Sequence, residues 1–275
     1  MHQKIIYNHQ LIIDNELNIS LQNRAFNYGD ALFESILVIN HKIYFLKDHY
    51  ERLILGCEYL KINTENLPNL EFLQQEIHIL LQSNNLKDAR VKINIWRKDG
   101  GLFTPQDNHL EYCIRAQSYS KSPKISKKLI NSPYKINEKS GFTFVKSANS
   151  LTYILSMIYA QEMHTNDCIL LNSQNQIVEC CSSNIFFEKD GIFYTPDLQS
   201  GCLPGIMRKN LIQLLHKKKI EVKEEKIMYE DFSNFDHCFS TNVMGISQIS
   251  QINEKCYPNF KIVEQFENEL YRSQS

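Results

Sequence analysis

The sequence predicts a mixed α+β fold built from two domains. Segments with the period of a strand and segments with the period of a helix both occur, but they do not alternate regularly as they would in a doubly wound sheet. One polar, serine-rich stretch, residues 118–124, interrupts the pattern near the middle of the chain. With 275 residues in total, each half is long enough to bury a core of its own.

The first half combines short strands with two helices. Asn8-His9 and Asn40-His41 are typical of tight turns, and each lies between runs of β-branched and aromatic residues. Apolar residues then recur at helical spacing in two later segments. In chain order we predict two strands within 4–13, two strands within 31–45, helices over 47–60 and 70–81, and strands over 89–96 and 110–116.

The polar stretch is the predicted boundary between the domains. We expect a small N-terminal domain over residues 1–118, a linker over 119–124 and a larger C-terminal domain over 125–275. In the second domain the predicted elements are a helix over 150–164, strands near 167–172, 176–181 and 183–188, a helix over 206–218, a strand near 236–241 and a helix over 260–271.

Composition excludes several classes of function. The chain has 30 Lys and Arg against 31 Asp and Glu, so its charge gives no reason to expect nucleic acid or an anionic membrane as a partner. No run of about 18 apolar residues and no secretory signal is found, and we expect a cytoplasmic protein. The eight cysteines have no metal-ligand spacing, so we expect them reduced and expect no metal site.

A lysine and a carboxylate carry the chemistry that the sequence suggests. Lys146 lies in the stretch Phe-Val-Lys-Ser-Ala-Asn-Ser-Leu, and Glu179 precedes Cys-Cys-Ser-Ser-Asn. A lysine that closes a Schiff base, a carboxylate that keeps a ring nitrogen protonated, and clusters of amides and hydroxyls for a phosphate are the groups needed to hold a phosphorylated pyridine aldehyde.

Further sequence blocks accompany Lys146 and Glu179, and all of them occur in the order found in one enzyme family. Together they resemble the class IV, or fold type IV, pyridoxal phosphate enzymes, which include branched-chain aminotransferases, D-amino acid aminotransferases and 4-amino-4-deoxychorismate lyases. The resemblance covers nearly the whole chain. It implies a D-amino acid aminotransferase-like fold with a small N-terminal α/β domain and a barrel-like C-terminal domain, pyridoxal 5'-phosphate as cofactor, a small amino substrate and a homodimer. The additional blocks are residues 24–35, 45–53, 195–196 and 205–208.

The resemblance also implies roles for single residues. Lys146 matches the lysine that binds the cofactor covalently and moves the substrate proton, and Glu179 matches the carboxylate that faces the ring nitrogen. Arg52 matches a phosphate-binding arginine, whose planar fork suits two phosphate oxygens. The remaining matches for cofactor binding are Ser182, Ser183, Asn184, Gly205, Ile206, Thr241 and Asn242.

Local motifs favour the lyase among the family's reactions. Branched-chain enzymes have a tyrosine five residues after the lysine, where this chain has Leu151. The segment around Thr241-Asn242 is similar to that of the lyases, and so are Lys92 and Arg97, which we expect to hold the carboxylates of a dianionic substrate. Strict alternation over 89–96 places Lys92 on the polar face of its strand.

Other features leave alternatives open. Phe33-Glu34 is a pair common among the aminotransferases, and Phe33 stands where D-amino acid enzymes use a tyrosine to bind substrate. We predict an aminodeoxychorismate lyase that forms 4-aminobenzoate and pyruvate. The alternatives are an aminotransferase for branched-chain or small amino acids, and a protein that binds pyridoxal phosphate without turnover.

Overall fold

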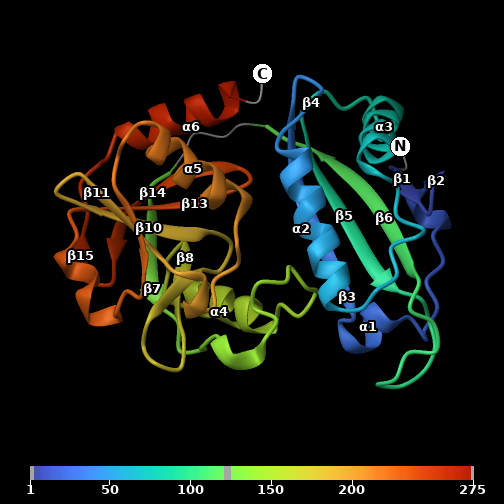
Figure 1. Ribbon diagram of the computed structural model, residues 1–275, viewed down its shortest axis with the longest axis horizontal. Helices are drawn as coiled ribbons and strands as arrows, with labels where there is room; N and C mark the ends of the chain where they lie inside the picture. Colours follow the sequence, from blue (N-terminus) through green and yellow to red (C-terminus); the bar gives the residue numbers. More distant parts are fainter. Residues whose placement is uncertain (1–2, 121–124, 274–275) are drawn as a thin grey trace. The chain divides into compact units, whose positions relative to one another are not determined.

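The described residues form two compact units. The computed structural model describes residues 3–120 and 125–273 (Figure 1). Unit 1 is the described part of residues 1–121 together with Val145–Asn149, and unit 2 is the described part of 122–144 and 150–275. Four residues of the predicted linker, 121–124, lie outside the described residues. Lys146 lies in a segment that we predicted for the C-terminal domain, and it belongs to unit 1.

Unit 1 is built on a six-stranded antiparallel sheet. The strand order is β2-β1-β6-β5-β3-β4, and each neighbouring pair is antiparallel. The strands predicted in the first half are therefore confirmed. They are β1 Lys4–Tyr7, β2 Gln10–Ile13, β3 Ala31–Ile39, β4 Lys42–Ile43, β5 Ala89–Arg97 and β6 Leu110–Ser118.

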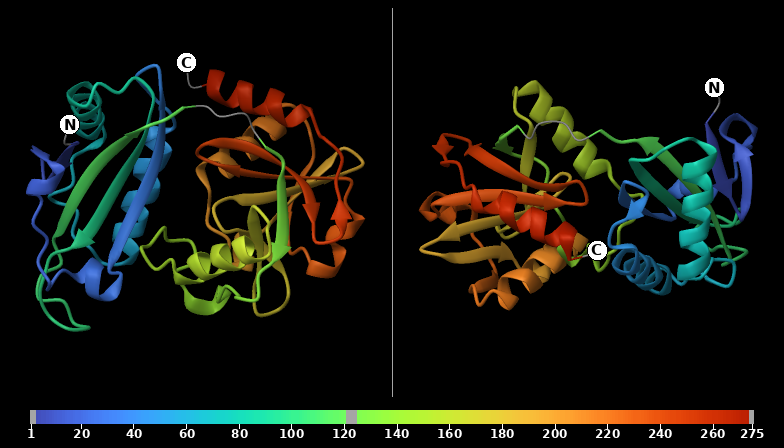
Figure 2. Two further views of the ribbon diagram at one scale, coloured as in Figure 1. Left: turned by 180° about the vertical axis from the view of Figure 1, so that it is seen from behind. Right: turned by 90° about the horizontal axis from the view of Figure 1, so that it is seen from above.

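Two helices cover one face of this sheet. Helix α2 spans Leu46–Tyr59 and contacts β3, whereas α3 spans Leu70–Ser83 and contacts β1 and β6 (Figure 2). Both helices bury apolar residues against the side chains of β3, β5 and β6 that point to that face, such as Ile36, Ile93 and Ile114. The short helix α1, Arg24–Tyr28, begins after Asn23, whose side chain accepts a hydrogen bond from the Phe26 amide.

Unit 2 is built on a nine-stranded mixed sheet that curls. Its order is β12-β11-β10-β13-β14-β7-β8-β9, with β15 paired to β14. Strand β9, at one end of this order, also contacts β10 and β11 near the other end, which gives the predicted barrel-like form. The strands are β7 Lys127–Asn131, β8 Asp167–Leu171, β9 Ile177–Cys180, β10 Asn184–Lys189, β11 Ile192–Pro196, β12 Val222–Glu225, β13 His237–Asn242, β14 Gly245–Ile252 and β15 Lys255–Cys256.

Three helices pack on this curled sheet. Helix α4, Leu151–Glu162, lies against β8, and it turns the small residues Ser156 and Ala160 towards the interior. Helices α5, Ile206–Lys217, and α6, Ile262–Arg272, contact each other and lie against β13 and β14 (Figure 1). No helix among the residues described combines the length and the apolar character needed to cross a bilayer.

The sequence analysis missed five strands of unit 2, namely the two-residue strand β15 and four longer ones. Strand β7 has the sequence Lys-Lys-Leu-Ile-Asn, and β12 has Val-Lys-Glu-Glu, so neither is apolar enough to be recognised from its own residues. Strand β11 follows β10 after a two-residue turn, and β14 mixes isoleucine with serine and glutamine. Their partners in the sheet, rather than their own composition, determine these four strands.

Candidate active site

Lys146 is held beside β3 by main-chain hydrogen bonds. The Phe33 amide donates to the Lys146 carbonyl at 3.0 Å, and the Ala148 amide donates to the Ala31 carbonyl at 2.8 Å. Opposed residues in an antiparallel pair share one face of a sheet, so Lys146 lies on the same face as Phe33. Its Nζ is 4.5 Å from the centroid of the Phe33 ring, within the range of a cation–π contact.

Lys92 approaches the same aromatic ring. Its Nζ also lies 4.5 Å from the Phe33 centroid, so the two ammonium nitrogens are separated by no more than twice that distance. Lys92 is paired across the sheet with Arg115, and Arg90 is two residues away on the same face. Burial, followed by the charges of Arg115 and Arg90, lowers the pKa of Lys92. An anion placed here would relieve the repulsion among these cations.

Arg97 does not join this group. It points to the opposite face of β5, as expected for an odd-numbered position in the alternation that starts at Val91. Its guanidinium donates to Asp30, to Asn108 and to two main-chain carbonyls. Burial would raise the pKa of Asp30, but hydrogen bonds from Arg97 and Arg24 outweigh it and lower the pKa. The structure therefore places Arg97 in a buried ion pair, whereas Arg115 and Arg90 accompany Lys92.

Arg52, a residue of helix α2, belongs to a second buried ion cluster. Its Nε and Nη2 atoms donate to the two carboxylate oxygens of Glu34, each at 2.7 Å, and His49 Nδ1 lies 2.8 Å from Glu34 Oε2. Glu34 is 1% exposed. Burial would raise the pKa of its carboxyl, but the charges of Arg52 and His49 outweigh burial and lower this pKa to about 2. The bidentate contact fixes the plane of the Arg52 guanidinium.

In unit 2, Glu179 occupies the third position of β9 and is 4% exposed. Its Oε1 accepts a hydrogen bond from the Tyr153 hydroxyl at 2.9 Å. Its Oε2 accepts from the Asn184 amide nitrogen and from the Leu203 main-chain amide, both at 3.2 Å. A carboxylate that accepts several hydrogen bonds is stabilised in its ionised form despite burial. Sequence reasoning found Glu179 and Asn184 but missed Tyr153.

Asn184 connects Glu179 with the start of helix α5. The same amide group donates to the Leu203 carbonyl at 2.8 Å. A Cβ atom on Gly205 would lie only 1.9 Å from Asn184 Oδ1, so a side chain at this position would displace Asn184. Gly205 is the N-cap of α5, and no side chain caps this end of the helix. Uncapped amides at a helix N-terminus favour an anion.

Hydroxyl groups gather where β10 and β13 meet. Asn184 is paired with Thr241, and Ile185 with Ser240. Within the part of the chain that the structure describes, Ser183 Oγ, Ser240 Oγ and Thr241 Oγ1 are buried and have no hydrogen-bond partner. A phosphate oxygen is an acceptor that such hydroxyls lack.

Asn242, the last residue of β13, lies at the same end of the β10–β13 pair. Its amide donates to the Ser182 carbonyl at 3.1 Å, and its Oδ1 accepts from the Met244 amide at 2.9 Å. The residues predicted for cofactor binding in unit 2 therefore lie together. With a buried carboxylate, uncapped helix amides and unpaired hydroxyls, this part of unit 2 fits a phosphorylated pyridine.

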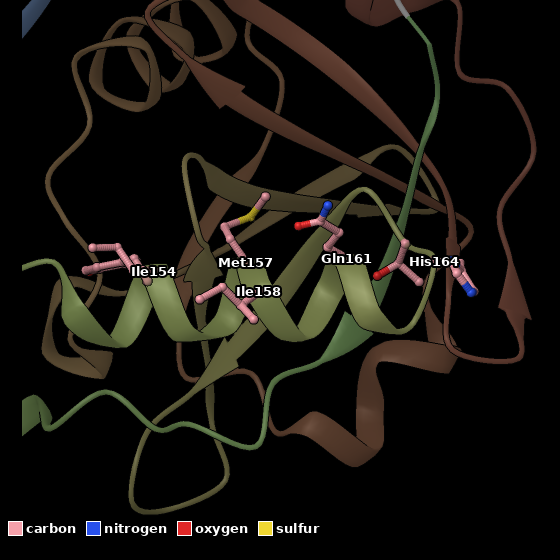
Figure 3. A pocket seen from close by; sticks show the side chains of 7 residues that line it. Ile154, Met157, Ile158, Gln161 and His164 are labelled. Atoms are coloured by element: carbon pink, nitrogen blue, oxygen red, sulfur yellow. The ribbon is translucent and has the colours of Figure 1, made fainter.

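A hollow of about 840 Å³ runs along α4 (Figure 3). Apolar residues of the helix such as Ile154, Met157 and Ile158 line it, and so does Tyr153, whose hydroxyl donates to Glu179. Its described lining contains no carboxylate and no lysine. The hollow therefore touches the candidate site at Tyr153 but does not contain the charged groups of that site.

Residues 31–252 match the family model described as amino-transferase class IV. The chain belongs to this family. Its fold is therefore the predicted fold type IV, and its cofactor is the predicted pyridoxal 5'-phosphate. Because the family consists of enzymes, a catalytic role is also confirmed.

Individual relatives agree on the family but differ in the reaction that their names describe. The chain is 29% identical to the "Probable branched-chain-amino-acid aminotransferase" of Rickettsia conorii, over 92% of this chain and 90% of that protein. The branched-chain amino acid aminotransferase of Thermobaculum terrenum in its PLP form has a TM-score of 0.89 at 21% identity, covering 99% and 94%. The "Putative 4-amino-4-deoxychorismate lyase" of Legionella pneumophila has a TM-score of 0.86 at 24% identity, covering 96% and 98%.

Replacing Glu34 tests the ion cluster of unit 1. The folded-state pKa of about 2 lies below the ordinary value of 4.5, so the stabilisation is complete above pH 4.5 and is lost as the pH falls towards 2. Glu34→Gln should lower the free energy of unfolding at pH 7 by about 3 kcal/mol. Urea unfolding between pH 7 and pH 3 should show the difference from wild type shrinking with acid. Glu51→Gln, on the exposed side of α2, is the control, and an equal loss in both variants would contradict the assignment.

Replacing Gly205 tests the close approach of Asn184. In Gly205→Ala the new methyl group displaces the Asn184 side chain, which loses its bonds to Glu179 and to the Leu203 carbonyl. We expect the dissociation constant of pyridoxal phosphate to rise by about tenfold, the effect of losing one hydrogen bond to a charged group. Equilibrium dialysis measures it. The control is Gly191→Ala, at a turn where φ is +80° and no atom lies within 4 Å of the added carbon. Backbone strain should lower its stability, but its affinity for pyridoxal phosphate should stay that of wild type.

Proposed function

We propose that this chain holds pyridoxal phosphate through residues in the roles that the family resemblance implies. Lys146 provides the covalent link, and Glu179 faces the ring nitrogen. In unit 2 the α5 amides at Gly205-Ile206 and the hydroxyls of Ser183 and Thr241 bind the phosphate. The buried, unpaired hydroxyls and the uncapped helix support this part of the proposal.

Further roles follow from the contacts seen around these groups. Arg52, with its guanidinium plane fixed by Glu34, contributes to phosphate binding. The Asn242 side chain donates a hydrogen bond to the Ser182 carbonyl, and this bond keeps the two residues together without a ligand. The Asn184 side-chain amide donates hydrogen bonds to Glu179 and to the Leu203 carbonyl, and so positions Glu179 rather than contacting the cofactor.

We infer that the reaction is the conversion of 4-amino-4-deoxychorismate to 4-aminobenzoate and pyruvate. The observation that carries this inference is that Lys92 and Lys146 meet over the single ring of Phe33. A substrate amine bound near Lys146 has a cation available for a carboxylate on the same face. Arg115 and Arg90 add positive charge there, which suits a substrate with two carboxylates.

The chemistry divides between the cofactor and the protein. Bound pyridoxal phosphate accepts electrons from the carbon that bears the amino group. Lys146 Nζ removes the proton from that carbon, and the neighbouring enolpyruvyl oxygen departs with the electrons of its bond to the ring. The proton then passes from Lys146 to the methylene carbon of the released enolpyruvate, which becomes pyruvate. Lys92 holds a substrate carboxylate and so fixes the orientation of the carbon–hydrogen bond relative to Lys146.

A second candidate is an aminotransferase for branched-chain amino acids. The name of the Rickettsia relative supports it, and so does the apolar ring of Phe33, which would contact an aliphatic side chain. The two candidates differ in product. With chorismate, glutamine and an aminodeoxychorismate synthase, the lyase produces fluorescent 4-aminobenzoate. With leucine and 2-oxoglutarate, the aminotransferase produces glutamate. Formation of glutamate without 4-aminobenzoate would replace the first candidate by the second.

Lys146→Ala should abolish covalent attachment of the cofactor. Borohydride treatment of the loaded wild-type protein should leave the reduced cofactor on the peptide that contains Lys146, as detected by mass spectrometry. The variant should carry none and should show no turnover. Lys139→Ala, an exposed lysine seven residues earlier, should behave as wild type. Cofactor found on another lysine of the wild-type protein would contradict the proposal.

Lys92→Ala should raise KM for the dianionic substrate by about tenfold, because a charge-assisted hydrogen bond is lost. The effect on KM for leucine should stay within about twofold, since an aliphatic side chain makes no such bond. Steady-state kinetics with both substrates provide the comparison. Lys87→Ala, an exposed lysine in the same unit, is the matched control. Equal changes for both substrates would remove Lys92 from substrate binding.

A further inference from the structure

We propose that Tyr153 is a positioning residue that keeps Glu179 ionised and oriented. The inference rests on the proposed role of Glu179 at the cofactor's ring nitrogen. Tyr153 is the third residue of α4, and its hydroxyl donates to Glu179 Oε1 at 2.9 Å. The other oxygen, Oε2, is held by Asn184 and Leu203. Donors on both oxygens fix the carboxylate plane, which one donor alone would leave free to rotate.

The surroundings of Tyr153 make it a donor rather than an acid. Burial, followed by the negative charge of Glu179, raises the pKa of the Tyr153 hydroxyl. The hydroxyl therefore keeps its proton and directs it at the carboxylate. Cys181 and Cys202 are the other titratable groups near it, and Arg208 lies close to Cys202. Burial raises the pKa of Cys202 to about 12, so that thiol stays neutral over the working range of pH.

The ring and the hydroxyl of Tyr153 have separable functions. The ring packs on a small apolar cluster that includes Leu170 and Val178. Tyr153→Phe keeps this packing and removes only the donor. A carboxylate that loses a hydrogen bond to its charged form has a higher pKa. Glu179 would then be protonated at a higher pH, and it would hold a protonated ring nitrogen less well.

The test compares Tyr153→Phe with wild type in the resting, cofactor-loaded protein. We expect the dissociation constant of pyridoxal phosphate to rise about tenfold by equilibrium dialysis. In activity, kcat should fall about tenfold with little change in KM, and the acid limb of its pH profile should move up by about one unit. Tyr159→Phe, on the same helix, is the control and should change none of these quantities.

A double-mutant cycle shows whether Tyr153 acts through Glu179. In a Glu179→Gln background the hydroxyl has no carboxylate to hold, so Tyr153→Phe should have no further effect on cofactor affinity. A full effect of Tyr153→Phe in that background would overturn the proposal. The proposal would also be overturned if Tyr153→Phe alone bound pyridoxal phosphate with wild-type affinity and left the acid limb of the pH profile unmoved.

Two further measurements keep the result interpretable. If Tyr153→Phe fails to fold by circular dichroism, 3-fluorotyrosine at position 153 retains the ring and strengthens the donor. It should move the acid limb in the opposite direction, and an unmoved limb would count against the proposal. Failure of the proposed function is distinguishable, because it would appear as covalent cofactor on a lysine other than Lys146, whatever the residue at position 153.

Discussion

Two main-chain hydrogen bonds determine where Lys146 lies. They join residues 145–149 to the first residues of β3, although the chain before and after this segment belongs to unit 2. Because the pairing is antiparallel, the position opposite Phe33 determines the face to which Lys146 points. The meeting of Lys146 and Lys92 over one ring follows from this register, since a shift by one residue would turn Lys146 to the helix-covered face.

Two buried glutamates show different solutions to the cost of burying a charge. Glu34 is matched by the Arg52 cation at 2.7 Å, so its charge is compensated inside unit 1. Three hydrogen bonds to Glu179 come from a phenol, an amide side chain and a main-chain amide, each of which is neutral. These neutral donors orient the Glu179 carboxylate, whereas the Arg52 cation both orients the Glu34 carboxylate and offsets its charge.

The sequence identified candidate residues of the site, but it did not predict which residues would form hydrogen bonds or ion pairs with them. Alternation over residues 89–96 correctly placed Lys92 on the polar face, and extending it by one residue would have put Arg97 on the other face. The family motifs nevertheless suggested that the two act together. The composition of β5 gave no sign that Asp30, many residues earlier, would pair with Arg97. Tyr153 could not be found for a related reason, because its partner Glu179 lies on a different element and no local pattern connects them.

The geometry around Asn184 explains why a single glycine is required at the start of α5. One amide group donates both to Glu179 and to the Leu203 carbonyl, while its oxygen lies against the α-carbon side of Gly205. A shift of the first turn of α5 would therefore move Asn184, and through it Glu179. Orientation of the carboxylate and position of the helix amides are thus set by the same side chain. An anion that fixes the helix N-terminus would restrict Glu179 as well, so the carboxylate and the helix amides are preorganised together rather than one at a time.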